Sequence, residues 1–125
     1  MSYSYDPQNI FAKILRGEIP NDTVIETEHS LAFNDINPQA KVHILVIPKG
    51  AYVSFDHFAL EASDAEIIDY TRTVGTVAKM AGVDLPGGDG FRLISNAGRN
   101  GVQEVPHLHV HILGGNPMGR MVSRD

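Results

Sequence analysis

Three of the six histidines of this chain lie within five residues, at His107, His109 and His111. Successive side chains of a β-strand point to opposite faces, so a strand here places the three imidazoles on one face and the intervening apolar residues on the other. One surface histidine needs no special explanation. Imidazole has no strand preference that would account for its repetition, so the row predicts a chemical function.

A metal site is one interpretation of the histidine row, because neutral imidazole is the commonest protein ligand for zinc. Residues two apart on a strand are roughly 6.5 Å apart and can share one ion, whereas His107 and His111 are roughly 13 Å apart. A straight strand therefore cannot place all three on one metal. His109 with one neighbour, together with His43 from another strand, remains open as a metal site.

Nucleophilic catalysis is the second interpretation, in which one imidazole attacks and the others hold its tautomer, bind an anion or assist the leaving group. Near pH 7 an imidazole is neutral enough to attack, and its neighbours are basic enough to donate protons. Attack on phosphorus gives a phosphoramidate that water later hydrolyses. Gly114 and Gly115 then allow a tight turn or close approach to a ligand, although an ordinary turn explains them equally well.

Composition excludes several functional classes. The 125 residues fit one domain, 1–125, and ten Lys and Arg against fifteen Asp and Glu leave a net charge of −5, which argues against binding long nucleic acid. The absence of cysteine excludes disulfides, thiolate metal sites and a Cys nucleophile. The longest strictly apolar run, 44–47, is too short for a membrane span, and the start lacks a signal-peptide pattern. We expect a cytoplasmic protein that acts on a small ligand.

Two helices are predicted from their end signals. Asp6 as N-cap and Gly17 beyond the last turn bound the first helix. Ser63 and Glu66 form a capping box at the start of the second helix, and Gly82 supplies its left-handed C-terminal residue. The residues expected on the buried face of the second helix are Ile67, Thr71, Val74, Ala78 and Ala81.

Five strands are predicted. Residues 23–28 and 31–33 are rich in β-branched and apolar residues and favour a hairpin. Residues 42–47 are almost continuously apolar, which is typical of a central strand buried on both faces. Residues 91–95 and 107–113 complete the set. Strands in runs, with no helix between each pair, favour an α+β fold: a five-stranded antiparallel sheet with two helices.

The segment VPHLHVHILGG, residues 105–115, resembles the signature of the histidine-triad family. Three further blocks, 10–20, 31–40 and 42–49, resemble the corresponding blocks of the Hint branch, the purine nucleoside phosphoramidases. The resemblance spans residues 10 to 115 in the same order. It implies a homodimer of α+β subunits whose five-stranded sheets join into one continuous sheet.

The implied reaction is hydrolysis of the P–N bond of purine nucleoside 5′-phosphoramidates, such as adenosine monophosphate linked to an amine. It passes through a nucleotidyl-histidine intermediate and needs no metal or organic cofactor. By position in the motif His109 is the nucleophile and His111 contacts the phosphate. His107 and His43 orient and polarise their neighbours.

The resemblance also implies a nucleotide site. Asp35 resembles the carboxylate that accepts hydrogen bonds from the ribose hydroxyls. Taken alone, the same residue reads as a turn residue that caps Asn37. The apolar wall expected to contact the base consists of Ile10, Phe11, Ile14 and Phe33, and Ile36 is expected beside the ribose. The donors expected to contact the α-phosphate come from Asn96, Val102, Gln103 and Glu104.

Three departures from the family pattern concern the leaving group. Glu104 stands where the best-known Hint proteins carry a small hydroxyl residue, Asn34 replaces a histidine, and the tail after Gly115 lacks their tryptophan. A carboxylate at position 104 repels phosphate unless it binds the leaving amine or takes a proton. Two alternative functions stay open: a dinucleoside polyphosphate hydrolase of the same superfamily, and a non-catalytic nucleotide-binding interaction module.

Overall fold

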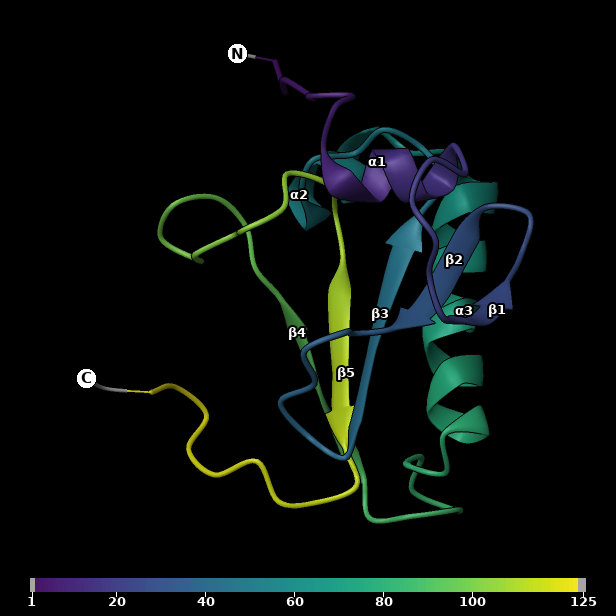
Figure 1. Ribbon diagram of the computed structural model, residues 1–125, viewed down its shortest axis with the longest axis vertical. Helices are drawn as coiled ribbons and strands as arrows, with labels where there is room; N and C mark the ends of the chain where they lie inside the picture. The colour runs from purple at the N-terminus through teal and green to yellow at the C-terminus, as the bar shows by residue number, and fades with distance from the viewer. Residues whose placement is uncertain (1, 124–125) are drawn as a thin grey trace.

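The computed structural model describes residues 2–123 and confirms the α+β fold, with one five-stranded antiparallel sheet of order β1-β2-β3-β5-β4 (Figure 1). Within the described part of the chain, no helix is long and apolar enough to cross a bilayer. The strands are β1 (Thr23–Glu26), β2 (Ser30–Asn34), β3 (Val42–Pro48), β4 (Phe91–Ser95) and β5 (Val110–Gly114). The helices are α1 (Ile10–Leu15), α2 (Phe55–Glu61) and α3 (Asp64–Met80).

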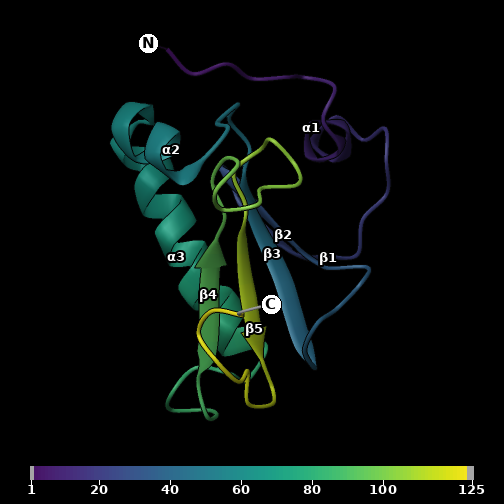
Figure 2. The ribbon, with the colours of Figure 1, turned by 90° about the vertical axis from the view of Figure 1, so that its left-hand side faces the viewer.

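Strand β3 is the centre of the sheet, as its continuous apolar sequence predicted. It pairs with β2 on one side and with β5 on the other. Helix α3 covers one face of the sheet, and α1 lies on the opposite face (Figures 1 and 2). Because side chains alternate along β3, Ile44 and Val46 join the core under α3, whereas Leu45 and Ile47 join the core under α1.

Helix α3 begins with the predicted capping box between Ser63 and Glu66 and is followed by Gly82 with φ of 72°. Its buried face differs from the prediction at Thr71, which is exposed. Tyr70 is buried instead, because its hydroxyl donates to the main-chain oxygen of Val46 at 2.7 Å and so carries the polar end of the ring into the core. The buried residues of α3 are Tyr70, Thr73, Val77 and Ala78.

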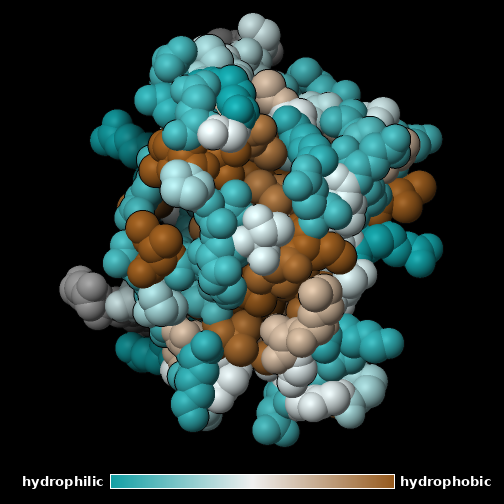
Figure 3. Space-filling view, turned by 45° about the vertical axis from the view of Figure 1, so that its right-hand side comes forward, coloured by the Kyte–Doolittle hydropathy of each residue, from teal (hydrophilic) through white to brown (hydrophobic). Residues whose placement is uncertain are grey.

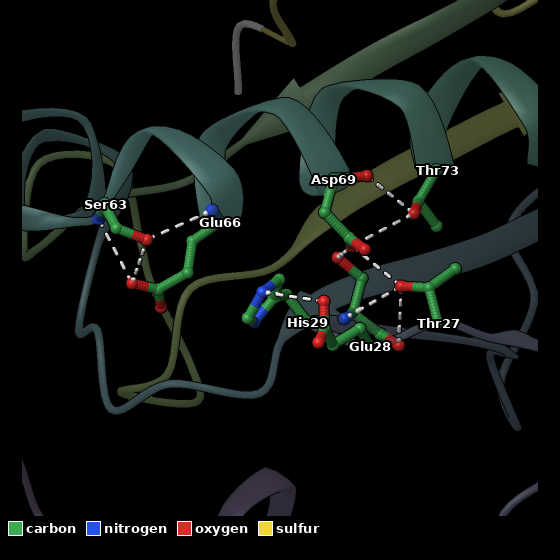
Figure 4. A network of polar contacts seen from close by, with 8 residues as sticks. Thr27, Glu28, His29, Ser63, Glu66, Asp69 and Thr73 are labelled. Carbon is green, nitrogen blue, oxygen red and sulfur yellow. Dashed lines mark hydrogen bonds and ion pairs between the residues drawn. The ribbon is translucent and has the colours of Figure 1, made fainter.

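A polar network fixes the turn between β1 and β2 to α3 (Figure 4). The carboxylate of Asp69 accepts hydrogen bonds from the hydroxyls of Thr27, at 2.7 Å, and Ser30, at 2.6 Å. Burial alone raises the pKa of Asp69, but the hydrogen bonds from Ser30 and Thr27 bring this pKa below its ordinary value. The ionised carboxylate therefore holds the β1–β2 hairpin against the helix.

The first helix starts later than predicted. Asn9, not Asp6, is the N-cap, and its side chain accepts from the main-chain nitrogen of Ala12. Asp6 instead organises the preceding turn, where its carboxylate accepts from the amide of Gln8 and its carbonyl from that of Asn9. An Asp before a Pro is typical of both a turn and a helix start, so composition alone did not separate them.

The structure differs from the prediction at two further places, the number of helices and the start of the last strand. Residues 2–123 form three helices, not two, because α2 folds between β3 and α3. This helix is short, its N-cap Ser54 makes no side-chain capping bond, and only His57 and Phe58 are buried, so it lacks both of the usual sequence signals. The last strand begins at Val110, and His107 and His109 precede its paired residues.

Candidate active site

A cavity of about 330 Å³ lies on the α1 side of the sheet. Its wall is formed by α1, the segment between α1 and β1, the end of β2 with the loop that follows it, and the loop that precedes β5, with one residue each from β3 and β5. Apolar surface gathers in a band between polar flanks on the face seen in Figure 3. Of the residues expected to contact nucleotide, those that line the cavity are Ile10, Phe11, Ile14, Phe33, Asp35, Ile36, Asn96, Val102 and Glu104.

His109 lines this cavity and presents one free ring nitrogen. Its Nδ1 lies 2.8 Å from the main-chain oxygen of His107, and since a carbonyl only accepts, Nδ1 carries the hydrogen. The lone pair is therefore on Nε2. Burial lowers the pKa of His109, opposed by the His107 carbonyl and by the charges of Asp35 and Glu104. The result is a neutral imidazole held as the tautomer that a nucleophile needs.

His111 also lines the cavity, and a chain of hydrogen bonds sets its tautomer. The amide of Gln39 donates to Nδ1 of His43 at 3.0 Å, so the hydrogen of His43 is on Nε2. That nitrogen lies 2.9 Å from Nδ1 of His111 and donates to it, which leaves the hydrogen of His111 on Nε2. Burial, together with the neighbouring His109 and His43, lowers the pKa of His111 to about 4. Neutral His111 is thus a hydrogen-bond donor.

His107 and His43 lie behind the cavity wall rather than in it. His107 is completely buried; its Nε2 donates to the main-chain oxygen of Pro48 at 2.8 Å, and its Nδ1 accepts from the hydroxyl of Tyr5 at 2.6 Å. Burial lowers the pKa of His107 to about 4, so it is neutral near pH 7. Of the four histidines predicted as catalytic, two face the cavity and two support them.

Asp35 caps a turn and also lines the cavity. Oδ1 accepts from the amide of Asn37 at 2.8 Å, which is the turn-capping role. Oδ2 lies 3.4 Å from Nε2 of His43, and the residue lines the cavity. Because a carboxylate oxygen has two acceptor sites, the cap leaves capacity for a ligand hydroxyl.

Gln103 is the expected nucleotide contact that the structure places outside the cavity lining. Its Nε2 donates to the carbonyls of Val53, at 2.6 Å, and Val105, at 3.0 Å, and its Oε1 accepts from the amide of Gly98 at 3.0 Å. A side-chain amide carries both donors and an acceptor, so the amide of Gln103 can bind main-chain carbonyls and a main-chain N–H at the same time. These three bonds hold the loop together. The adjacent Val102 lines the cavity with φ of 55°, a strained value for a β-branched residue.

A group of possible metal ligands differs from the one that the sequence left open. One ligand atom each from Asp35, His43 and His111 lies within 4.8 Å of the others. Imidazole and carboxylate suit zinc. A metal there would replace the hydrogen bond between the two histidines, and it would leave Nε2 of His109, the cavity-facing lone pair, unligated.

The sequence reasoning missed several residues of the site. Leu45 had a usable signal, since strand alternation places it on the same face as His43. Tyr5 and Gln39 had none, because the partner of Tyr5 is far along the chain and Gln39 contacts His43 through its own main-chain amide, which any residue type offers. The other cavity residues that were missed are Ile19, Pro20, Asn21, Asp22, Asn34 and Val105.

Comparison with known proteins places this geometry among relatives. The model of the HIT domain family matches residues 16–118. A HIT-like protein of Azospirillum brasilense is 56% identical over 99% of both chains. The purine nucleoside phosphoramidase of Escherichia coli is 41% identical over 93% of this chain and 94% of its own length. A solved histidine triad protein from Clostridium difficile superposes with a TM-score of 0.77 at 41% identity, covering 94% and 98% of the two chains.

Proposed function

The chain belongs to the HIT domain family, and from that membership we propose that it hydrolyses the P–N bond of purine nucleoside 5′-phosphoramidates. Relatives named as hydrolases support a hydrolase in general. The phosphoramidase name belongs to the Escherichia coli relative, and its match over most of both chains supports the narrower proposal. No step of the proposed reaction requires a metal or an organic cofactor.

One observation carries the proposal: the free Nε2 of His109 and the Nε2–H of His111 face one cavity. In the first step Nε2 of His109 attacks phosphorus and the P–N bond breaks. The Nδ1–H of His109 stays bonded to the His107 carbonyl, which stabilises the positive charge that the ring acquires. Water then attacks the nucleotidyl-histidine and releases the nucleoside monophosphate.

His111 is the proposed proton donor. An anionic substrate next to this imidazole raises its pKa, so that His111 takes a second proton as substrate binds. It gives the Nε2 proton to the leaving amine and regains one from the attacking water. When Nδ1 of His111 is also protonated, the Nε2–H of His43 has a second acceptor in Oδ2 of Asp35, 3.4 Å away. His43 therefore keeps a hydrogen-bond acceptor in both charge states of His111, first His111 itself and then Asp35.

The nucleoside portion is placed by the remaining cavity residues. Phe11 and Phe33, whose rings meet edge to face at 5.6 Å, belong to the apolar wall proposed for the purine. Asp35 is proposed to accept the ribose hydroxyls. No lysine or arginine is among the described residues that line the cavity, so the phosphate charge must be met by histidine and by neutral donors such as Asn96.

We also propose a homodimer joined at β4. This strand has one neighbour, β5, so its other edge is unpaired within the described chain. Phe91 and Leu93 on β4 are about half exposed, which is unusual for an edge that stays in water. Light scattering should give twice 13.6 kDa at micromolar concentration, and Leu93→Lys should lower that mass. A monomer in the unaltered protein would contradict the dimer.

The experiment that tests the function is a paired assay of the purified protein with an adenosine phosphoramidate and a dinucleoside triphosphate. Turnover of the phosphoramidate alone, or in large excess, supports the proposal. Faster turnover of the dinucleoside substrate supports the polyphosphate hydrolase of the same superfamily. Binding of adenosine monophosphate without turnover of either substrate supports the interaction module.

A further inference from the structure

The N-terminal segment reaches the catalytic machinery at one point, through Tyr5. Its hydroxyl lies 2.6 Å from Nδ1 of His107, and its ring meets that imidazole edge to face at 5.6 Å between centroids. Tyr5 does not line the cavity. Its contact is with the back of the histidine row.

The direction of this hydrogen bond follows from the partners of His107. Nε2 of His107 faces the main-chain oxygen of Pro48, which only accepts, so the single hydrogen of the neutral ring is on Nε2. Nδ1 is then an acceptor, and the hydroxyl of Tyr5 is the donor. Burial raises the pKa of Tyr5, so the phenol keeps its proton at neutral pH.

Removing this donor has a consequence for the nucleophile. Nδ1 of His107 lies in a residue with no exposed surface, so without Tyr5 it becomes a buried acceptor that lacks a partner. The carbonyl of Pro48 still favours a hydrogen on Nε2, but the ring has lost one of the two bonds that fix its orientation, and turning to find a new partner for Nδ1 breaks its bond to Pro48. The same residue supplies the carbonyl that holds the Nδ1–H of His109. A disturbance of His107 therefore reaches the attacking ring directly.

We propose that Tyr5 is a positioning residue that fixes the orientation of the His107 ring, whose tautomer Pro48 sets, and, through the carbonyl of His107, the orientation of the nucleophile His109. Its catalytic consequence rests on the proposed function, because His109 is the attacking group there. The orientation that Tyr5 gives His107 does not depend on which substrate the protein uses.

The segment that carries Tyr5 is held at a second point, which supplies a matched control. The ring of Tyr3 stacks on His57 of α2, with 4.2 Å between centroids and 9° between planes, and its hydroxyl donates to Asp56. Tyr3→Phe removes a hydroxyl from the same segment without touching the histidine row. Tyr5→Phe keeps the ring and its edge contact with His107 but removes the donor.

The test combines kinetics with ¹⁵N NMR of the imidazoles, recorded without substrate on folded protein below its Tm. Tyr5→Phe should lower kcat roughly tenfold with KM within about twofold, since a positioning effect acts on the reactive geometry and not on cavity contacts. The kcat and KM of Tyr3→Phe should both stay within about twofold of the values for the unaltered protein. In the unaltered protein His107 should show one protonated Nε2 and one acceptor Nδ1, and Tyr5→Phe should replace this pattern by averaged or exchanged signals.

An unchanged His107 pattern and an unchanged kcat in Tyr5→Phe would overturn the inference, and so would equal losses in Tyr3→Phe. If the unaltered protein turns over no phosphoramidate but the His107 pattern still depends on Tyr5, the proposed function fails and the positioning role stands. The two failures are therefore distinguishable.

Discussion

Strands β3 and β5 have two faces with contrasting construction. On the α3 side Ile44, Val46, Val110 and Ile112 pack against the helix as one apolar cluster, which depends on shape and burial. On the α1 side β3 carries His43, β5 carries His111, and the segment before β5 carries His107 and His109; these rings depend on directed hydrogen bonds. The first face tolerates small adjustments of position, whereas the second fixes where each hydrogen lies.

This difference explains why the candidate active site lies on the α1 side of the sheet. An apolar cluster gains free energy in proportion to the area it buries and has no preferred direction. The imidazoles are buried as well, but each supporting ring has partners for both nitrogens, His107 with Tyr5 and Pro48, and His43 with Gln39 and His111. His109 and His111 each present one ring nitrogen to the cavity instead, a lone pair on His109 and an N–H on His111, and reactivity is expected there.

The largest expected effect is on the chemical face. His109→Ala should lower kcat by about a thousandfold or more, because removing the nucleophile removes the two-step route. Nucleotide binding and the free energy of unfolding should change little, since the ring contributes no core contact under α3. Steady-state kinetics with a binding assay checks this. Retention of more than a tenth of the original kcat would exclude His109 as the nucleophile.

Asp35→Ala should have the next largest effect, and only on one class of substrate. Loss of a hydrogen bond to a charged acceptor costs roughly 1.5–3 kcal/mol, or about tenfold to a hundredfold in kcat/KM. The kcat/KM for ribonucleotide substrates should fall by this factor, while the kcat/KM for the 2′-deoxy analogue should change little. The preference for ribose over deoxyribose should therefore become smaller.

Asp35→Asn is the matched control for the turn cap, because its Oδ1 can still accept from Asn37. It should retain the stability of the unaltered protein but lose part of the ribose preference. Equal losses on ribose and deoxyribose substrates in Asp35→Ala would mean that the residue acts only through the turn. No loss on either substrate would place the ribose elsewhere.

The apolar face is tested by Val77→Ala on α3, a residue with no exposed surface. Removing its two methyl groups should lower the free energy of unfolding by about 2 kcal/mol. The kcat of the folded protein should stay within about twofold of its original value. Urea denaturation alongside the phosphoramidate assay measures both. A large fall in kcat at unchanged stability would show that the two faces are not independent.

Lowering the pH should lower the free energy of unfolding through the buried histidines of the α1 side. The pKa values of His107 and His111 are about 4 in the folded protein because burial disfavours the charged rings, against 6.5 unperturbed. The unfolded chain therefore binds more protons between these values, and the free energy of unfolding should fall as pH drops from 6.5 towards 4.

Denaturation with urea at pH 7 and pH 5 measures this fall. Val77→Ala should lower stability equally at both pH values, because the apolar face does not titrate there. His111→Asn should reduce the difference between the two pH values. A stability that is the same at both pH values in the unaltered protein would contradict burial of neutral imidazoles.

The smallest expected effect is that of metal removal. EDTA should leave kcat unchanged, since the proposed attack by Nε2 of His109 needs no metal and the Asp35–His43–His111 group is joined by its own short contacts. Elemental analysis of the purified protein and assays before and after chelation measure this. Stoichiometric zinc together with loss of activity in EDTA would support the metal site instead.

The two faces also differ in how far the sequence predicted them. Alternation and β-branching predicted β3 and the segregation of the histidines from the apolar residues of β5, because both depend on local periodicity. The buried face of α3 was wrong at Thr71, because Tyr70 fits the helical spacing equally well and the contact that favours it, from its hydroxyl to the carbonyl of Val46, cannot be read from the sequence.

On the chemical face the sequence predicted which residue types take part but not how they are held. The supporting bonds run to main-chain oxygens, as from His107 to Pro48, or to residues far along the chain, as from Tyr5. Gln103 illustrates the same limit: a polar residue next to the motif was expected to contact nucleotide, and its side-chain amide holds the loop outside the cavity lining. Only the folded chain decides between these uses of the same group.

The proposed covalent step is tested most directly by trapping the intermediate. The protein is mixed with adenosine phosphoramidate, quenched within the first turnovers under alkaline denaturing conditions, which preserve histidine–phosphorus bonds, and digested for mass spectrometry. The expected result is an adenylyl group on the peptide that contains His109, located on that residue and absent from His109→Ala. Turnover without any adduct, or an adduct on another histidine, would contradict the assignment of Nε2 of His109 as the attacking atom.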